Sequence, residues 1–170
     1  MIIRVSDIPE EGLQIEGVTA LERPFADPAW TLDDLSLHVE KDGDAVFVSG
    51  RLAARVPQGC SRCLEPFQVT VEPSIEARFV PDAAGPGEER ELGARDLDTD
   101  VYRAGQLDVR ELVETETSLA LPMKPLCRED CRGLCPVCGG NRNLVACSCE
   151  TAAADPRWAP LKDLSERLSR

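Results

Sequence analysis

The stretch Cys127–Cys149, CREDCRGLCPVCGGNRNLVACSC, holds six of the eight cysteines of this 170-residue chain. Its cysteines form C-x-x-x-C, C-x-x-C and C-x-C pairs, and a second C-x-x-C lies more than sixty residues upstream, at Cys60 and Cys63. Four chelating pairs supply eight thiolates, which is the number that two closed four-thiolate sites require. Soft thiolate ligands in a tetrahedral cage select zinc. The sequence therefore predicts two structural zinc ions.

The spacing of the cysteines indicates how they divide between the two ions. A site that uses the C-x-x-C and C-x-C pairs closes locally, since Cys147 follows Cys138 by nine residues, and its cost in loop entropy is small. We predict one site made by Cys60, Cys63, Cys127 and Cys131, and a second made by Cys135, Cys138, Cys147 and Cys149. The first would pin the cysteine-rich module to the upstream hairpin. The competing division joins the two C-x-x-C pairs as a zinc ribbon, and it stays open.

Other uses of paired cysteines fit less well. The start of the chain is acidic and carries no secretory signal, and no run exceeds four consecutive apolar residues, which predicts a cytoplasmic, reducing setting. There paired cysteines are more often metal ligands than disulfides. An iron–sulfur cluster would also take four thiolates, but neither group has ferredoxin spacing. The reactive cysteine of a thiol oxidoreductase opens a helix after a strand, whereas Cys60 lies between two expected strands.

Most of the chain upstream of the cysteine-rich stretch predicts strands. Alternating or β-branched runs cover residues 2–8, 13–19, 35–40, 45–56, 67–80 and 100–107, and KDGD at 41–44 is a hairpin turn signal. The loop 57–66 between two of these strands carries the first C-x-x-C. Residues 81–99 are rich in glycine, proline and acidic side chains, which is typical of a loop.

Two helices are predicted after the strands. Asp108 has the character of an N-cap with Glu111 as its capping-box partner, and the helix ends near Leu121 before a proline. A terminal helix begins at Asp155, with apolar residues at helical spacing. We therefore predict an α+β fold, an antiparallel sheet of about six strands with one or two helices and a C-terminal zinc-knuckle module. Its expected parts are a β-rich domain (1–124), the zinc module (125–150) and an amphipathic helix (151–170).

Charge and residue types argue against an enzyme and against a broad nucleic-acid footprint. The net charge is −12: residues 1–123 carry 11 basic and 25 acidic side chains, and residues 124–170 carry 8 and 6. The single histidine, His38, points away from the apolar face of its strand and reads as an exposed surface residue. Four-thiolate sites leave no open position for water or substrate. The sequence favours a binding protein with no small-molecule substrate and no membrane segment.

Several motifs together resemble a known family. GCSRCLEPF at 59–67, LPMKPLC at 121–127, CREDCRGLCPVCGGNRN at 127–143, then CSC and DPRWAPLKDL at 155–164 are similar to the YceD family of large ribosomal RNA subunit accumulation proteins. This resemblance covers about Gly59 to Leu164. It implies a role in accumulation or maturation of large-subunit rRNA, in the cytoplasm and without a known catalytic activity. The two-zinc module is an expectation for this chain from its own spacing.

Charge and resemblance together give one main hypothesis and two others. In the main hypothesis, zinc knuckles present basic side chains to rRNA phosphates, in free rRNA or a pre-ribosomal particle. The candidate contacts are Arg51, Arg55, Arg62, Lys124, Arg128, Arg132 and Arg142. An acidic body also suits an adaptor or chaperone for a basic ribosomal protein. A thiol redox or metal sensor is the third hypothesis.

Overall fold

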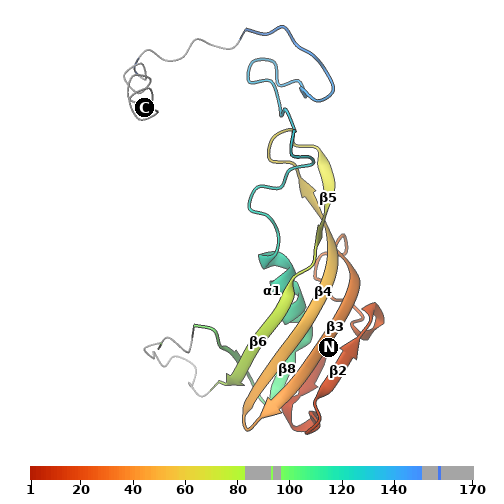
Figure 1. Ribbon diagram of the computed structural model, residues 1–170, viewed down its shortest axis with the longest axis vertical. Helices are drawn as coiled ribbons and strands as arrows, with labels where there is room; N and C mark the ends of the chain where they lie inside the picture. Colours follow the sequence, from red (N-terminus) through yellow and green to blue (C-terminus); the bar gives the residue numbers. More distant parts are fainter. Residues whose placement is uncertain (83–92, 94–96, 151–156, 158–170) are drawn as a thin grey trace, which may run out of the picture. The chain divides into compact units, whose positions relative to one another are not determined.

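The computed structural model describes residues 1–82, 93, 97–150 and 157. The chain divides into two compact units. The first consists of Met1–Cys60 and Glu65–Cys127 and contains all the strands and the helix shown in Figure 1. The second joins the four residues Ser61–Leu64 to the described residues from Arg128 onward. The expected terminal helix at 151–170 lies outside the described residues, apart from Arg157.

A long hairpin forms the centre of the first unit. β3 (Thr31–Asp42) pairs antiparallel with β4 (Ala45–Gly59), and the KDGD turn joins them with Gly43 at φ +60°. The side chains on one face of both strands are buried: Leu32, Leu35, Leu37, Val39, Val46, Val48, Leu52, Ala54 and Val56. Each fully buried aliphatic side chain contributes about 1.5–3 kcal/mol relative to exposure. The alternation of residues therefore sets which face of the hairpin becomes core.

β4 is long enough to pair with two successive strands on its other side. β5 (Pro66–Val71) pairs with its second half and β6 (Ser74–Pro81) with its first half, both antiparallel. The expected single strand at 67–80 is thus two strands, since Pro73 between them has no N–H for the ladder. β2 (Leu13–Glu16) joins β3, and β7 (Asp100–Tyr102) runs parallel to β6 at the other edge. The sheet has six strands, with β2-β3-β4-β6-β7 in order and β5 on β4.

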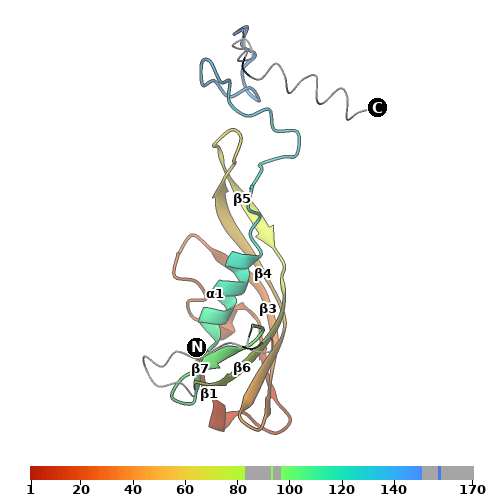
Figure 2. The same ribbon diagram turned by 90° about the vertical axis from the view of Figure 1, so that its left-hand side faces the viewer.

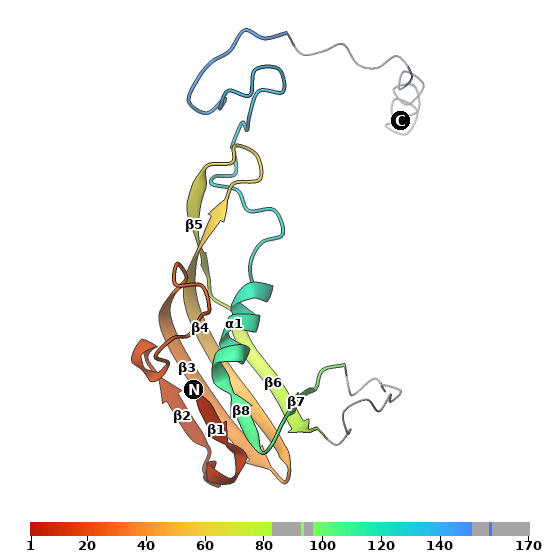
Figure 3. The same ribbon diagram turned by 180° about the vertical axis from the view of Figure 1, so that it is seen from behind.

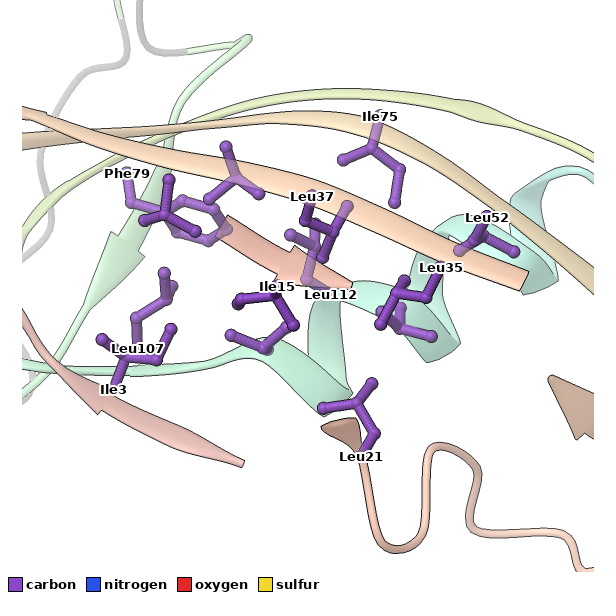
Figure 4. Packing of buried hydrophobic residues seen from close by; sticks show 14 of the residues in the cluster. Ile3, Ile15, Leu21, Leu35, Leu37, Leu52, Ile75, Phe79, Leu107 and Leu112 are labelled. Atoms are coloured by element: carbon purple, nitrogen blue, oxygen red, sulfur yellow. The ribbon is translucent and has the colours of Figure 1, made fainter. Parts of the chain in front are cut away.

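The remaining elements cover the apolar face of the sheet. β1 (Ile2–Arg4) and β8 (Gln106–Asp108) form a two-stranded antiparallel sheet, and β8 leads directly into α1 (Val109–Leu119). Figures 2 and 3 show α1 lying along one face of the large sheet, with β1 and β8 on the same side. Short 3₁₀ turns, Val5–Asp7 and Val18–Ala20, follow β1 and β2. Figure 4 shows the core between these layers, where Leu112 of α1 meets Leu37 of β3.

The start of α1 is defined by a side-chain cap. Asp108 Oδ1 accepts a hydrogen bond of 3.0 Å from the backbone N–H of Arg110, as expected for the N-cap. Partial burial of Asp108 opposes its ionisation, but the hydrogen bonds from Arg110 hold its pKa below the usual range. Val109, Leu112 and Val113 are buried, so the helix presents its expected apolar face to the sheet.

The structure confirms the predicted fold class and corrects several element boundaries. The sheet is mostly antiparallel, with one parallel pair and one α-helix among the described residues. The expected strands at 2–8 and 13–19 are shorter, because each turns into a 3₁₀ segment. His38 is half-buried rather than exposed: its Nε2 lies 2.7 Å from Glu40, and its ring packs close to Gly12. None of the helices in the described ranges is long and apolar enough to span a bilayer.

Two candidate metal centres

The upstream C-x-x-C forms the tight turn between β4 and β5. The N–H of Cys60 donates to the carbonyl of Glu65 at 3.0 Å, which closes the turn across five residues. Cys60 and Cys63 are both buried, and Leu64, directly after the second cysteine, has φ +64°. A leucine at positive φ is uncommon, because its Cβ crowds the following carbonyl. This strained conformation is part of the turn that brings the sulfurs of Cys60 and Cys63 close together.

The downstream C-x-x-C has the same turn. The N–H of Cys135 donates to the carbonyl of Gly140 at 2.8 Å, again across five residues, and Gly139 after the second cysteine has φ +71°. The N–H of Gly139 also donates to the carbonyl of Cys135 at 2.9 Å. The two turns therefore share one backbone design, with glycine at the left-handed position of the second and leucine at that of the first.

This difference gives a test of the turns as metal knuckles. Leu64 is 69% exposed, so Leu64→Gly removes backbone strain and loses little packing. We expect this substitution to stabilise the folded turn by about 0.6 kcal/mol. The zinc affinity of the group that contains Cys60 and Cys63 should therefore rise about threefold. Gly139→Ala should lower the affinity of its own group about fivefold. Competition with a chromophoric chelator measures both. A Leu64→Gly variant that binds zinc more weakly than the wild type would contradict the shared design.

The structure brings the eight sulfurs together in two groups of four. We name Cys60, Cys63, Cys127 and Cys131 the first group, and Cys135, Cys138, Cys147 and Cys149 the second group; within each, all sulfurs lie within 4.8 Å of one another. These are the two groups expected from spacing, and the structure contains no disulfide among them. With bonds of about 2.3 Å, a regular tetrahedron of sulfurs around zinc has edges of about 3.8 Å. Both groups therefore have the donor type and the compactness that a metal ion requires.

The electrostatics of the second group also favour a cation. Hydrogen bonds from the backbone N–H groups of Cys138 and Val137 lower the pKa of Cys135 to about 6. The hydrogen bond with Cys138, followed by burial, raises the pKa of Cys149 to about 12, and the hydrogen bond with Cys135 raises the pKa of Cys147. One thiolate thus forms readily and discourages the next. A divalent cation would displace the remaining protons and bind all four sulfurs as thiolates. Because protons compete with the metal for these sulfurs, metal affinity should fall as the pH is lowered.

Two of the predicted RNA-contacting arginines have acidic neighbours. The guanidinium of Arg55 makes a two-pronged contact with Asp33, with Nε at 2.7 Å and Nη2 at 2.8 Å. This contact lowers the pKa of Asp33. Arg128 Nε lies 3.4 Å from the carboxylate of Asp130. Asp33 therefore occupies the two guanidinium N–H donors that Arg55 would use to hold a phosphate.

A third arginine, Arg62, contacts the backbone of its own unit. Its Nη1 donates to the carbonyls of Glu129 at 3.2 Å and Cys131 at 3.0 Å, and its own carbonyl accepts from the N–H of Leu134 at 3.1 Å. Gly133, at φ +69°, lies so close that an added Cβ would be 2.9 Å from the Arg62 carbonyl oxygen. Arg62 thus holds the turn Ser61–Leu64 against the segment 129–134.

The other four basic side chains are exposed. Arg51 and Lys124 belong to the first unit, while Arg132 and Arg142 belong to the second. Within the described part of the chain, their side chains make no hydrogen bond or ion pair. That the seven basic residues contact RNA stays a prediction.

The residue that spacing arguments do not single out is Asn143. Its Oδ1 accepts from the N–H of Arg132 at 2.8 Å, and its Nδ2 donates to the sulfur of Cys131 at 3.3 Å. The available signal is weak, an N-x-N motif at 141–143 between the cysteine pairs of the second group.

Two acidic hollows border α1 in the first unit. One, of about 470 Å³, is lined by residues of β7, β8 and α1, including Asp100, Asp108, Glu111 and Glu116. The other, of about 390 Å³, is lined by residues 23–26, Asp108 and α1; it contains Glu111 and Glu114 and also Arg23 and Arg110. Carboxylates outnumber arginines in both linings, so this surface has a negative character.

Comparison with known proteins gives a family and relatives. The family model described as "Large ribosomal RNA subunit accumulation protein YceD" matches residues 48–165. Proteins of Mycobacterium bovis and Mycobacterium tuberculosis, both described as uncharacterized, are 36% identical over 141 residues, which is 77% of this chain and 61% of theirs. A Mycobacterium leprae protein with the same description is 29% identical over 131 residues, or 58% of its length. The chain thus spans about three fifths of these relatives, and no solved structure matches it.

Proposed function

Because the chain belongs to the YceD family of large ribosomal RNA subunit accumulation proteins, we propose that it is a non-catalytic cytoplasmic factor that contacts large-subunit rRNA through a zinc-stabilised module. The zinc ions are held by the first and second groups of cysteines, and the contacts come from exposed arginines beside them. The family description supports the role in rRNA accumulation, and the two groups of four sulfurs support metal binding.

The observation that supports the rRNA contact is the placement of two arginines on backbone that hydrogen bonds hold in position beside the second group. The N–H of Arg142 donates to the carbonyl of Gly133 at 2.9 Å, and the N–H of Arg132 donates to Asn143. Both side chains are exposed. Arg132 lies three residues before Cys135, and Arg142 lies four residues after Cys138, so both flank the C-x-x-C turn of the second group. A backbone that is already ordered loses little entropy when it binds. A guanidinium can then hold a phosphate through two parallel hydrogen bonds.

The acidic first unit restricts such contacts to a small area. Its charge repels phosphates, whereas the described residues of the second unit carry five arginines and three carboxylates. We therefore propose weak, local binding through about two phosphates, with a slope of log affinity against log salt of about −1.4 for a single strand.

Replacing both exposed arginines tests this proposal. Arg132→Ala combined with Arg142→Ala should lower affinity for transcribed fragments of large-subunit rRNA about tenfold and remove most of the salt slope. Fluorescence anisotropy at several salt concentrations measures both. Arg55→Ala is the matched control, because Asp33 already occupies that guanidinium. RNA affinity that is independent of salt, or unchanged in the double variant, would rule out the phosphate contact.

A specific observation favours a second candidate function, that of an adaptor for a basic ribosomal protein. Carboxylates outnumber arginines in the linings of the two hollows beside α1, which suits lysine- and arginine-rich segments. Capture experiments with and without ribonuclease separate the two candidates. Ribosomal proteins that stay bound after RNA digestion, and are lost on Glu111→Lys, favour the adaptor; loss on digestion favours direct RNA binding.

A further inference from the structure

We propose that Asn143 couples the two metal centres, so that zinc in the second group strengthens the binding of zinc in the first. Asn143 lies between the two cysteine pairs of the second group but donates a hydrogen bond to Cys131, which belongs to the first. The inference rests on the metal occupancy proposed above and concerns how the two sites influence each other.

The amide of Asn143 is oriented by its contacts. Its oxygen accepts from the N–H of Arg132 at 2.8 Å, and its nitrogen donates to the Cys131 sulfur at 3.3 Å. The nitrogen also lies 2.9 Å from the side-chain oxygen of Asn141, which accepts from the backbone N–H of Asn143 as well. In the flipped orientation, oxygen would face the sulfur and the Asn141 oxygen, and nitrogen would face an N–H. The N–H to sulfur contact is therefore specified by the surrounding donors and acceptors.

The position of Asn143 depends on the second group. Residues 133–135 and 140–142 pair antiparallel: the N–H of Cys135 donates to the Gly140 carbonyl, and the N–H of Arg142 donates to the Gly133 carbonyl. This ladder begins at a cysteine of the second group and ends beside Asn143. A two-stranded ladder of this length is not stable by itself in water. Metal held by the second group closes the loop and so fixes the ladder with Asn143 at its end.

The hydrogen bond matters for the first group because of charge. Four thiolates around one Zn²⁺ leave a net charge of about −2, and an N–H donor that points at a sulfur stabilises the ionised form. Donors to metal ligands typically change metal affinity by 10- to 100-fold. An empty second group frees the loop that carries Asn143, so the first group loses this donor. Thermodynamic linkage requires the same coupling in the opposite direction.

The test uses the full chain, prepared without metal under anaerobic conditions and titrated with Zn²⁺ against a chromophoric chelator. Cys147→Ser with Cys149→Ser removes the second site, and Asn143→Asp keeps the oxygen used by Arg132 but has no N–H for Cys131. We expect each change to lower first-group affinity about tenfold. We expect the combination to be no weaker than either alone, since both remove the same hydrogen bond. Leu144→Ala, in the same loop and 77% exposed, is the control that should leave affinity unchanged.

A spectroscopic readout separates this role from general support of the loop. In the protein loaded with ¹¹³Cd²⁺, Asn143→Asp should shift the cadmium resonance of the first group and leave that of the second in place. Two bound zincs whose affinities are independent, or losses that add in the combined variant, would overturn the coupling while the metal sites stand. A wild-type chain that binds no zinc would overturn the metal sites and the coupling together.

Discussion

Replacing Cys135 and Cys138 together with serine should unfold residues 132–149 and leave the large sheet folded. Apolar packing holds this segment only weakly, because the side chains of Val137, Leu144 and Val145 are 58–77% exposed. Structural zinc in small cysteine sites supplies about 10–16 kcal/mol of apparent binding energy, which here is local folding energy. Hydrogen exchange should show loss of protection in 132–149 and none in β3 and β4, and zinc content should fall from two ions to one.

The matched variant removes the other C-x-x-C. Cys60→Ser with Cys63→Ser should also leave one zinc, but the lost protection should lie in residues 60–65 and 127–131. The ladder between β4 and β5 should persist, because Ala54–Gly59 pairs antiparallel with Pro66–Val71 over six residue pairs outside the turn. Identical exchange patterns in the two variants would show that the division into first and second groups is wrong. Wild-type protein treated with a chelator should lose protection in both regions.

The spacing of the cysteines was a good guide to which sulfurs meet, for a physical reason. Loop entropy rewards short closures, and the second group closes within 15 residues, Cys135 to Cys149. The alternation in β3 and β4 was equally informative, since a strand with one buried face must place every second side chain in the core. Such local and periodic signals survive in a single sequence.

Contacts between distant residues left no such signal. The pairing of Arg55 with Asp33 depends on the β3–β4 register, which contains a bulge between Leu32 and Asp34. Nothing in the sequence around Arg62 indicates that its guanidinium donates to the carbonyls of Glu129 and Cys131. Both were expected to face RNA. The sequence shows where basic residues occur. Whether their side chains can contact RNA depends on the partners that the fold places beside them.

The second large effect is expected at Gly50, in the middle of β4. A Cβ added there would lie 2.1 Å from the carbonyl oxygen of Ser36 and 2.9 Å from the Cα of Leu37, both in the backbone of β3. Its φ of +152° is also one that side chains rarely adopt. In the sequence, Gly50 looks like a minor interruption of an alternating strand. In the fold it is where the two central strands approach too closely for any side chain.

Gly50→Ala should therefore lower the free energy of unfolding by about 4 kcal/mol or more, because neither β3 nor β4 can move without disturbing strands on both sides. β4 pairs with β3, β5 and β6, so a shift at Gly50 spreads through most of the sheet. Gly43→Ala is the matched control: its φ is also positive, but no atom lies within 4 Å of the added Cβ, and strain alone costs about 1 kcal/mol. Urea unfolding of the zinc-loaded variants measures the difference. Equal losses would mean that the close approach of β3 to Gly50 is not a constraint on the fold.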